Sequence, residues 1–467
     1  MYSYADSSKL TQEHTFYSRI NLNSRKTPIL ISRIEDDPLL EGLPERATFI
    51  PLRQKDLQSV LIQKFQITDG DLDEYKNLCS RLQAIFHVEH LSSLLYLEDI
   101  YDTLDPDSNI VNLETVSVEK REALTNALLD KLKKLLLSAH YKRLSQEELE
   151  RAVEIGGQWG VQLDVKFDIY ERLEIFARGY RTVKLTRRRW QKLFRQESIE
   201  LPEFQRLIMA FRMSPSFNAG KKDKVKKSQK SLDEKFVYLK AFKNIPENDL
   251  EILLPGSKVR LTKLDRAKIL LPTLSGMAFT IWKVARGVLV LSLAIHFANI
   301  LVWAILIGAI GGYIFKSVLS YLNTKNKYQF GLTESLYIKN LDNNSGVIYR
   351  ILNEAEEQEL CEAVLAYTFL WKHAERGQGL SENELDRLVE EFLEKTTGID
   401  VDFEVHDGLG KLERLGLAVK NDQHLWFASP IESATELLNK NWNELFESRA
   451  TKTANFENPL DDDLFTN

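Results

Sequence analysis

The sequence predicts an α+β membrane protein: a transmembrane helical hairpin joins an N-terminal soluble domain of helices and antiparallel sheet to a C-terminal winged-helix-like domain. Three observations predict this fold class. Residues 287–315 contain no charged side chain, residues 161–242 contain several strand-like runs, and residues 354–447 follow the order helix, helix, helix, hairpin, helix. Hydrophobic content of 43% and charged content of 28% are typical of a folded chain and exclude a transporter with many spans.

The N-terminal region is predicted to be helical. Apolar residues recur at a three-to-four spacing between residues 78 and 94, which indicates a helix with one buried face. A second helix is predicted over residues 116–140, after a proline-containing turn. The predicted parts of the whole chain are a flexible tail (1–27), a mainly helical region (28–160), an antiparallel β region (161–260), a transmembrane hairpin (261–322), a winged-helix-like domain (350–447) and an acidic tail (448–467).

The β region is predicted to contain four strands, over residues 170–180, 181–186, 204–213 and 235–242. Gly179 lies between the first two, where a hairpin connection is expected. The polar, lysine-rich residues 214–232 are predicted to form a disordered loop within this region.

Two apolar stretches predict the membrane hairpin, with spans at about residues 269–285 and 290–315. The uncharged run 287–315 would measure about 43 Å as a helix, against a hydrocarbon core of about 30 Å. Lys283 and Arg286 separate the stretches, and a turn there keeps both cations out of mid-membrane. The alternative is an interfacial helix before a single span, with the C-terminal part on the opposite side.

Cations flanking the two stretches predict the orientation. Eight lie on the shared side and two in the turn, which places both soluble parts on the cytoplasmic side. The eight are Lys258, Arg260, Lys263, Arg266, Lys268, Lys316, Lys325 and Lys327. Small residues that allow close packing of the membrane helices are Gly276, Thr280, Ala304, Gly308 and Gly312.

A cationic run stands out in the β region. Residues 178–195 contain eight cations and no anion: Arg178, Arg181, Lys184, Arg187, Arg188, Arg189, Lys192 and Arg195. Such a run is most often a solvated face. In a membrane-tethered protein, a patch that contacts anionic lipid headgroups is expected over a nucleic-acid patch, because no recognised RNA or DNA module accompanies it.

The C-terminal part is strongly acidic. Residues 351–467 contain 26 acidic and 10 basic residues, so the first 350 residues carry a net charge of +10 within the total of −6. Ser381 and Glu384 form a capping box at the second helix. The third helix, at about residues 402–417, carries four acidic residues and two cations, which phosphate would repel. A winged helix that binds protein or packs against the basic sheet is therefore expected, and DNA binding is not.

Other local motifs carry little chemistry. Asp69, Asp71 and Asp73 alternate as in a calcium loop, but the required glycine and glutamate are missing, so they indicate an acidic helix start. His87 and His90 match neither zinc-protease spacing and are expected to be structural. The two cysteines lie far apart. No catalytic motif, cofactor site or metal site is predicted.

Several blocks of the sequence resemble the domain of unknown function 3754 family, whose eukaryotic relatives include transmembrane protein 143. The resemblance covers about residues 46–447. It implies an integral membrane protein of bacteria (cyanobacteria notably), plastids or mitochondria, with a bacterial inner or thylakoid membrane as the expected location, and supplies no established activity. The blocks are FIPLRQKDL, LCSRLQAIFHVEHLSSLLYLEDIYDTLDPDS, VYLKAFKNIPENDLEILLPGSKVRLTKLDRAKI, SLYIKNLDNNSGVIYRILNEAEEQELCEAVLAY and VDFEVHDGLGKLERLGL.

The expected function is that of a membrane-anchored scaffold or adaptor whose cytoplasmic domains contact anionic lipid and an unknown protein partner, with self-association as a further option. The alternatives are an enzyme acting on lipid or at the membrane surface, with the segment around His87 and His90 as its centre, and a membrane-tethered nucleic-acid-binding regulator.

Overall fold

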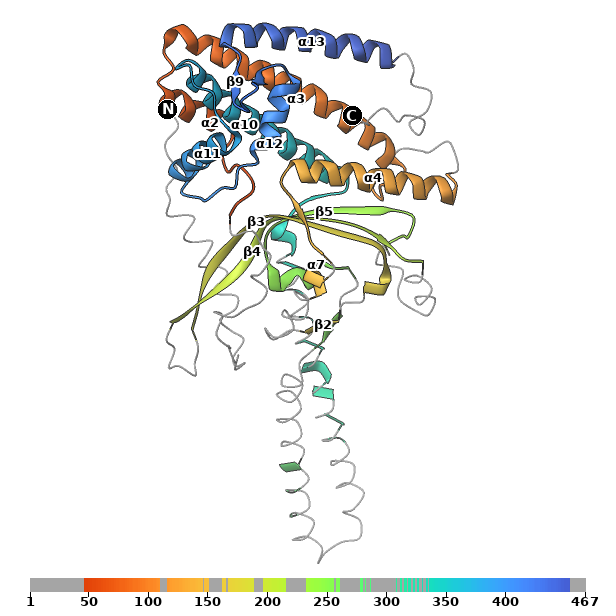
Figure 1. The fold of residues 1–467 in the computed structure, drawn as a ribbon. Coiled ribbons are helices and arrows are strands. Elements are labelled where there is room, and N and C mark those ends of the chain that lie inside the picture. Colours follow the sequence, from red (N-terminus) through yellow and green to blue (C-terminus); the bar gives the residue numbers. More distant parts are fainter. Residues whose placement is uncertain are drawn as a thin grey trace, which may run out of the picture.

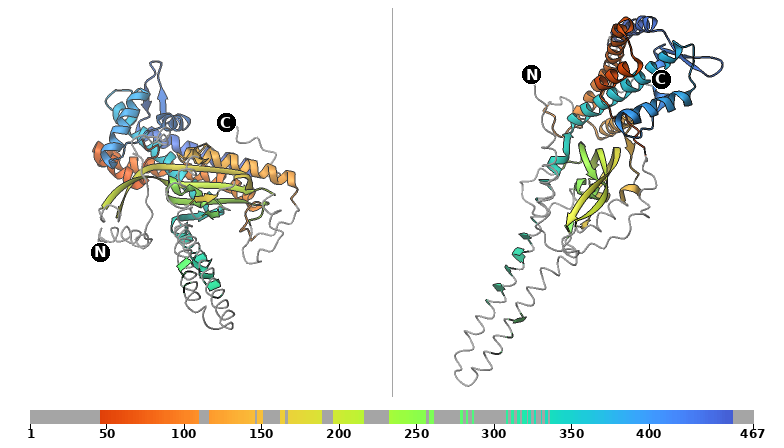
Figure 2. Two further views of the ribbon diagram at one scale, coloured as in Figure 1. Left: turned by 90° about the horizontal axis from the view of Figure 1, so that it is seen from below. Right: turned by 90° about the vertical axis from the view of Figure 1, so that its left-hand side faces the viewer.

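A computed structural model places helices above an antiparallel sheet, and the side view shows the same layers (Figures 1 and 2). The described residues are 46–109, 116–145, 147–150, 162–164, 167–188, 196–215, 232–255, 258–260, scattered positions between 278 and 334, and 336–453.

Three helices form the N-terminal part; two of them were predicted as helices, and α2 is an addition within the region predicted to be mainly helical. They are α2 (Gln54–Phe65), α3 (Asp69–Asp102) and α4 (Val118–Ser138). Helix α3 begins at the acidic run, where carboxylates complement the positive end of the helix dipole. Its predicted apolar face is buried: Leu78, Leu82 and Phe86 are each fully covered. The start of α3 at Asp69 confirms the prediction of an acidic helix start.

The main sheet has the strand order β1-β3-β4-β5-β7, and every pairing is antiparallel. Its strands are β1 (Lys142–Arg143), β3 (Tyr170–Arg188), β4 (Gln196–Met213), β5 (Val237–Pro246) and β7 (Asn340–Asn343). A second small sheet pairs β2 (Gln162–Asp164) with β6 (Lys258–Arg260). Three short helices connect strands of the two sheets. Helix η5 (Phe167–Ile169) lies between β2 and β3, and η7 (Glu247–Asp249) and α7 (Leu250–Leu253) lie between β5 and β6.

The prediction of a hairpin connection at Gly179 is wrong. Strand β3 runs without interruption through this glycine, and its pairing with β4 keeps one register from Arg172 to Arg188. Strands β3 and β4 continue together beyond the end of β5, because β5 pairs with β4 only from Glu203 onward. We call residues 179–188 with 196–203 the arm; its residues 196–202 pair with β3 but not with β5, and it projects from the body of the sheet in Figure 1.

Gly179 marks the point where the arm leaves the sheet. Its φ of +69° is rarely adopted by residues with a side chain, and an added Cβ would lie 2.9 Å from Gln205 Oε1 and 3.0 Å from the Phe49 ring. Gly179→Ala is therefore expected to lower the free energy of unfolding by about 1–3 kcal/mol, measured by chemical denaturation.

Gly377→Ala provides the matched control for this substitution. Gly377 has a φ of +71°, yet nothing lies within 4 Å of an added Cβ there. Its cost should be confined to the backbone and be about 1 kcal/mol. Equal losses in the two variants would contradict a steric role for the contact between Gly179 and Phe49.

The C-terminal part contains the elements expected from the sequence, in the expected order. These are α10 (Ser345–Ala374), α11 (Glu382–Thr397), α12 (Val405–Arg414), β8 (Ala418–Lys420), β9 (Trp426–Ala428) and α13 (Ile431–Thr453). The predicted capping box of Ser381 and Glu384 is present. Leu380 exchanges two backbone hydrogen bonds with Trp426, of 3.1 and 2.8 Å, and so adds a third short strand segment beside the hairpin.

Helix α10 links the apolar cores of the molecule. Its first half, with Val347 and Ile351, packs with α4 and the sheet. Its second half, with Leu365 and Phe369, packs with α2, α3 and the C-terminal elements from α11 to α13. Helix α13 lies along α3 (Figure 1). The segments at 50–86 and 360–438 therefore share one core, although the sequence separates them widely.

The predicted membrane-protein class is corrected by the structure. Among the residues that it describes, no helix combines the length and the apolarity that crossing a bilayer requires. The fold supported is a mixture of helices and antiparallel sheet. The predicted location in a bacterial inner or thylakoid membrane, with both flanking parts cytoplasmic, is corrected with it. Almost all of the predicted spans, at 269–285 and 290–315, and of the loop at 214–232 lie outside the described residues.

Candidate functional site: a charge network around helix α10

Three polar residues of α10 lie at four-residue intervals, which places them along one side of the helix: Glu354, Gln358 and Glu362. All three have buried side chains or nearly so. Gln358 accepts a hydrogen bond from the backbone N–H of Ile50 at 2.8 Å and donates to its carbonyl at 3.2 Å. This side of α10 therefore holds the chain that leads into α2.

Glu362 is the most deeply buried carboxylate of this row, with 1% of its side chain exposed. One oxygen contacts Nε2 of His140, directly after α4, and the other accepts from Lys411 Nζ of α12 at 2.5 Å. His140 Nδ1 lies 3.6 Å from Glu404. Two cations and two carboxylates from three parts of the chain thus meet at one point, which we call the Glu362 cluster.

Burial and charge act in opposite directions on His140. Burial by itself lowers the pKa of the imidazole, because it disfavours the charged ring. The carboxylates of Glu362 and Glu404 outweigh burial and raise that pKa from 6.5 to about 9. Glu404 responds in the other direction, since its contact with His140 lowers its pKa. His140 is therefore a cation at neutral pH in the folded protein.

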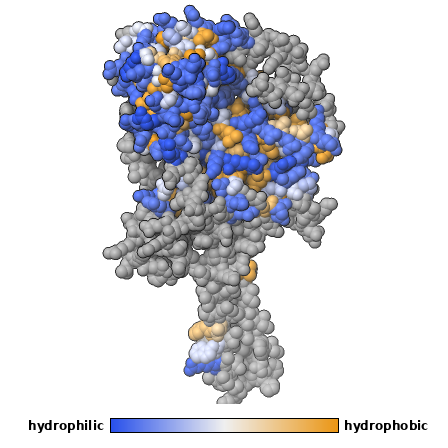
Figure 3. All heavy atoms as spheres, viewed as in Figure 1, coloured by the Kyte–Doolittle hydropathy of each residue, from blue (hydrophilic) through white to orange (hydrophobic). Residues whose placement is uncertain are grey.

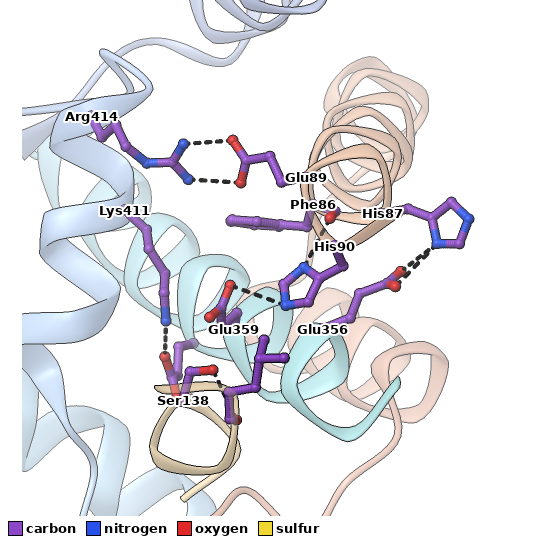
Figure 4. A network of polar contacts seen from close by, with 11 residues as sticks. Phe86, His87, Glu89, His90, Ser138, Glu356, Glu359, Lys411 and Arg414 are labelled. Atoms are coloured by element: carbon purple, nitrogen blue, oxygen red, sulfur yellow. Dashed lines mark hydrogen bonds and ion pairs between the residues drawn. The ribbon is translucent and has the colours of Figure 1, made fainter. Parts of the chain in front are cut away.

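Figure 4 shows how α3 joins this network. His87 Nδ1 lies 3.0 Å from Glu356, and His90 Nδ1 lies 2.9 Å from the carbonyl of Phe86 with its other nitrogen toward Glu359. The two rings thus turn to different partners and share no ligand position. In the part of the chain that the structure describes, no group of three or more His, Cys, Asp or Glu side chains is arranged to hold a metal ion.

The same close-up shows the outer contact of α12 (Figure 4). Arg414 binds both carboxylate oxygens of Glu89 on α3, with nitrogen–oxygen distances of 2.5 and 3.1 Å. Bidentate pairs of this kind are the stronger and more directional ion pairs. Both cations of α12 are consequently bound to other parts of the same chain.

Of the predicted lipid-contacting cations, Arg178 has a structural role instead. Its side chain is 9% exposed and lies 2.9 Å from Glu354 of α10. The guanidinium also stacks over the rings of Phe49 and Tyr141. It therefore fastens the sheet to α10 and is not part of an exposed patch.

The other described cations of the predicted patch lie on the arm, and two of them form ion pairs with the neighbouring strand. Arg181 lies 2.7 Å from Glu203 and Lys184 lies 3.0 Å from Glu200. In the register of the strands, Arg187 faces Glu197 and Arg188 faces Gln196. Arg189, Lys192 and Arg195 lie outside the described residues. The compensating carboxylates come from the neighbouring strand, so the spacing within the cationic run does not indicate them.

Two of the five predicted positions for membrane-helix packing lie among the described residues. Gly276, Thr280 and Ala304 lie outside the described residues. Gly308 and Gly312 are helical, and among the described residues nothing lies within 4 Å of a Cβ added at either position. Close packing at these positions stays a prediction.

Both cysteines are buried in the core around α10 and α3. Burial raises the pKa of the Cys79 thiol to about 12 and raises the pKa of Cys361 further still. The thiolate, which is the reactive form, is therefore scarce at neutral pH. These cysteines act as small apolar residues.

The Glu362 cluster was not predicted, although the sequence contains a signal for it. Glu362 is the only charged residue between Leu360 and Trp371, in a stretch that is otherwise apolar. A carboxylate buried in such a stretch requires a cation or hydrogen-bond donors. Its partners, His140 and Lys411, are too distant in sequence to be recognised from spacing.

The comparison with known families bears on the sheet region. Residues 204–346 match the model of a family described as "Protein of unknown function (DUF3754)". The predicted resemblance to this family is confirmed. The DUF3754 match begins in β4 and ends at the start of α10, so it contains β5 and β7. A closer relation to transmembrane protein 143 stays a prediction, and no solved structure matches the chain.

Proposed function

We propose that the chain is a protein-interaction scaffold. In it, the elements in winged-helix order (α11, α12, β8 and β9) are a structural part of the helical core and not a DNA reader. The orientation of α12 carries this proposal. In winged-helix DNA readers the third helix enters the major groove and presents cations to it. Here α12 packs against α10, with Lys411 bound to Glu362 and Arg414 bound to Glu89.

The close approach of α12 to α10 supports this assignment. A Cβ added at Gly408 would lie 3.3 Å from Ala366 Cβ and 3.3 Å from the carbonyl of Glu362. Asp407 and Glu413 of α12 are both exposed. Phosphate would repel these carboxylates, so the outer surface of α12 does not favour nucleic acid.

The surface of the helical part is consistent with contact to other proteins. Hydrophilic side chains cover most of the described face in Figure 3, with smaller apolar areas between them. The most exposed large apolar side chains of α3 and α10 include Leu95 and Tyr349. Interfaces of transient complexes are about as apolar as the rest of a protein surface, so this mixture suits an adaptor.

Arg414→Ala tests the inward role of α12. If the helix is structural, the variant and the wild type should have the same affinity for duplex DNA. Raising the salt from about 50 to 200 mM should change the two affinities equally. The ion pair with Glu89 is half-exposed, so its loss should cost at most about 1 kcal/mol of stability. A fall in affinity with a shallower salt dependence in the variant would instead assign α12 to DNA.

A scaffold must also have a partner of its own. Affinity capture of the full chain from its native extract, with Arg414→Ala as a folded control, should recover the same specific partner with both proteins. Capture that recovers no partner above the level of an unrelated protein would contradict the proposal.

Anionic lipid headgroups are the second candidate partner. Strand β3 of the arm carries Arg181, Lys184, Arg187 and Arg188 in sequence, and each cation near an anionic surface contributes about 1 kcal/mol. The carboxylates of Glu200 and Glu203 reduce this attraction, because they lie within ion-pair distance of two of these cations. A protein partner is therefore favoured.

A further inference from the structure

The arm has an open edge along β3. Strand β1 pairs with β3 only at Phe176 and Ala177. Beyond these positions, among the strands that the structure describes, β3 has a partner only on its β4 side. Residues 179–188 therefore leave an edge of about 33 Å, at about 3.3 Å per residue, along which another strand can pair.

The direction of the backbone groups on this edge follows from the pairing. The carbonyl of Ile175 accepts a hydrogen bond from the N–H of Leu144, on the side away from β4. Backbone groups of antiparallel strands alternate in direction, and the register with β4 is unbroken to Arg188. The N–H and C=O groups of Arg181, Val183, Leu185 and Arg187 therefore point outward from the sheet.

The two strands of the arm carry opposite charge. Residues 181–188 of β3 contain four cations and no anion, whereas residues 196–203 of β4 contain three glutamates and no cation. Arg181 and Lys184 have carboxylates on their β4 side, and their side chains are still 47% and 72% exposed. A strand added beside β3 would place its own side chains next to these cations on the free side.

We propose that the outer edge of β3 in the arm is a docking site for an extended, acidic segment of a partner protein, which adds to the sheet as a further strand. The proposal rests on the scaffold function and names the class of partner. Backbone hydrogen bonds supply affinity, and carboxylates beside Arg181 and Lys184 select acidic over basic segments.

The test uses the full chain and two synthetic probes of alternating sequence, one of glutamate and valine and one of lysine and valine. Fluorescence anisotropy should show that the acidic probe binds at least tenfold more tightly than the basic probe. Hydrogen exchange of the free protein should be fast at the amides of Arg181 and Val183, and binding of the acidic probe should slow it.

Two matched variants separate backbone pairing from general attraction. Val183→Pro removes one outward N–H, which makes no bond to β4, and should lower affinity for the acidic probe about tenfold. Val183→Thr keeps that N–H and a β-branched side chain, so its affinity should equal that of the wild type.

A double variant tests the charge preference. Exchanging the charges, Lys184→Glu with Glu200→Lys, keeps the ion pair and should weaken the preference for the acidic probe.

Several outcomes would overturn the proposal. Equal binding by Val183→Pro and the wild type would exclude pairing at this edge. Slow exchange at Val183 in the free, monomeric protein would show that a segment of the same chain occupies the edge, and dimers that Val183→Pro dissociates would show that a second copy does. Binding of vesicles with anionic lipid, but not of the acidic probe, would assign the arm to headgroups. Binding of DNA through Arg414 would refute the scaffold function and leave these results unchanged.

Discussion

Glu362→Ala is expected to lower the free energy of unfolding by about 3–5 kcal/mol, because it leaves His140 and Lys411 without their shared counter-charge in the protein interior. Both cations have little access to water, and a buried charge without a partner is strongly unfavourable. Denaturant unfolding followed by circular dichroism measures this loss directly. The substitution also weakens the contact of α12 with α10, so the midpoint should fall without a separate transition.

Glu356→Ala is the matched control, since it lies on the same helix and also contacts a histidine. His87 is 65% exposed, so this pair is in contact with solvent and should contribute at most about 1 kcal/mol. A similar loss in the two variants would show that removing a glutamate from α10, and not breaking the buried cluster, causes the effect.

The second large effect expected is a loss of stability as the pH rises from neutral to alkaline. The folded-state pKa of His140 is about 9, against 6.5 without the fold. The stabilisation is therefore complete below about pH 6.5, declines as the pH rises, and is lost above about pH 9. The interval corresponds to about 3 kcal/mol, since each pKa unit is worth about 1.4 kcal/mol.

Denaturant unfolding at intervals between pH 6 and pH 9.5 tests this expectation, with His140→Asn as the reference. Residue 140 has a φ of +59°, a conformation that asparagine tolerates better than most residues. Subtracting the curve of the variant from that of the wild type removes the contributions of other titrating groups. A difference that does not decline with rising pH would exclude His140 as a buried cation.

Local patterns predicted the local structure well. The three-to-four spacing in α3, the acidic start of that helix and the capping box of α11 each depend on residues within a few positions of one another. The long β3 strand was divided wrongly at Gly179, because a glycine between strand-like runs is typical of a turn. Here the glycine instead accommodates Phe49 and Gln205, two residues that the sequence does not place nearby.

Contacts between residues far apart in the sequence could not be predicted from local patterns. The cationic run at 178–195 indicated an exposed patch, but Glu354, Glu200 and Glu203 lie opposite its members in space. The Glu362 cluster depends on residues from three distant segments, so no motif of fixed spacing describes it. The membrane-spanning class was inferred from hydropathy and from the family resemblance, and the helices that the structure describes do not support it.

The core that α10 completes also has a consequence for synthesis of the chain. Ile50 and Gln358, which hydrogen bond to each other, are 308 positions apart. At about 5–20 residues per second, a ribosome needs about 15–60 s to reach the second residue after the first. During this interval the apolar faces of α2 and α3 emerge without their final neighbours, so chaperone occupancy of nascent chains should be greatest before α10 leaves the exit tunnel.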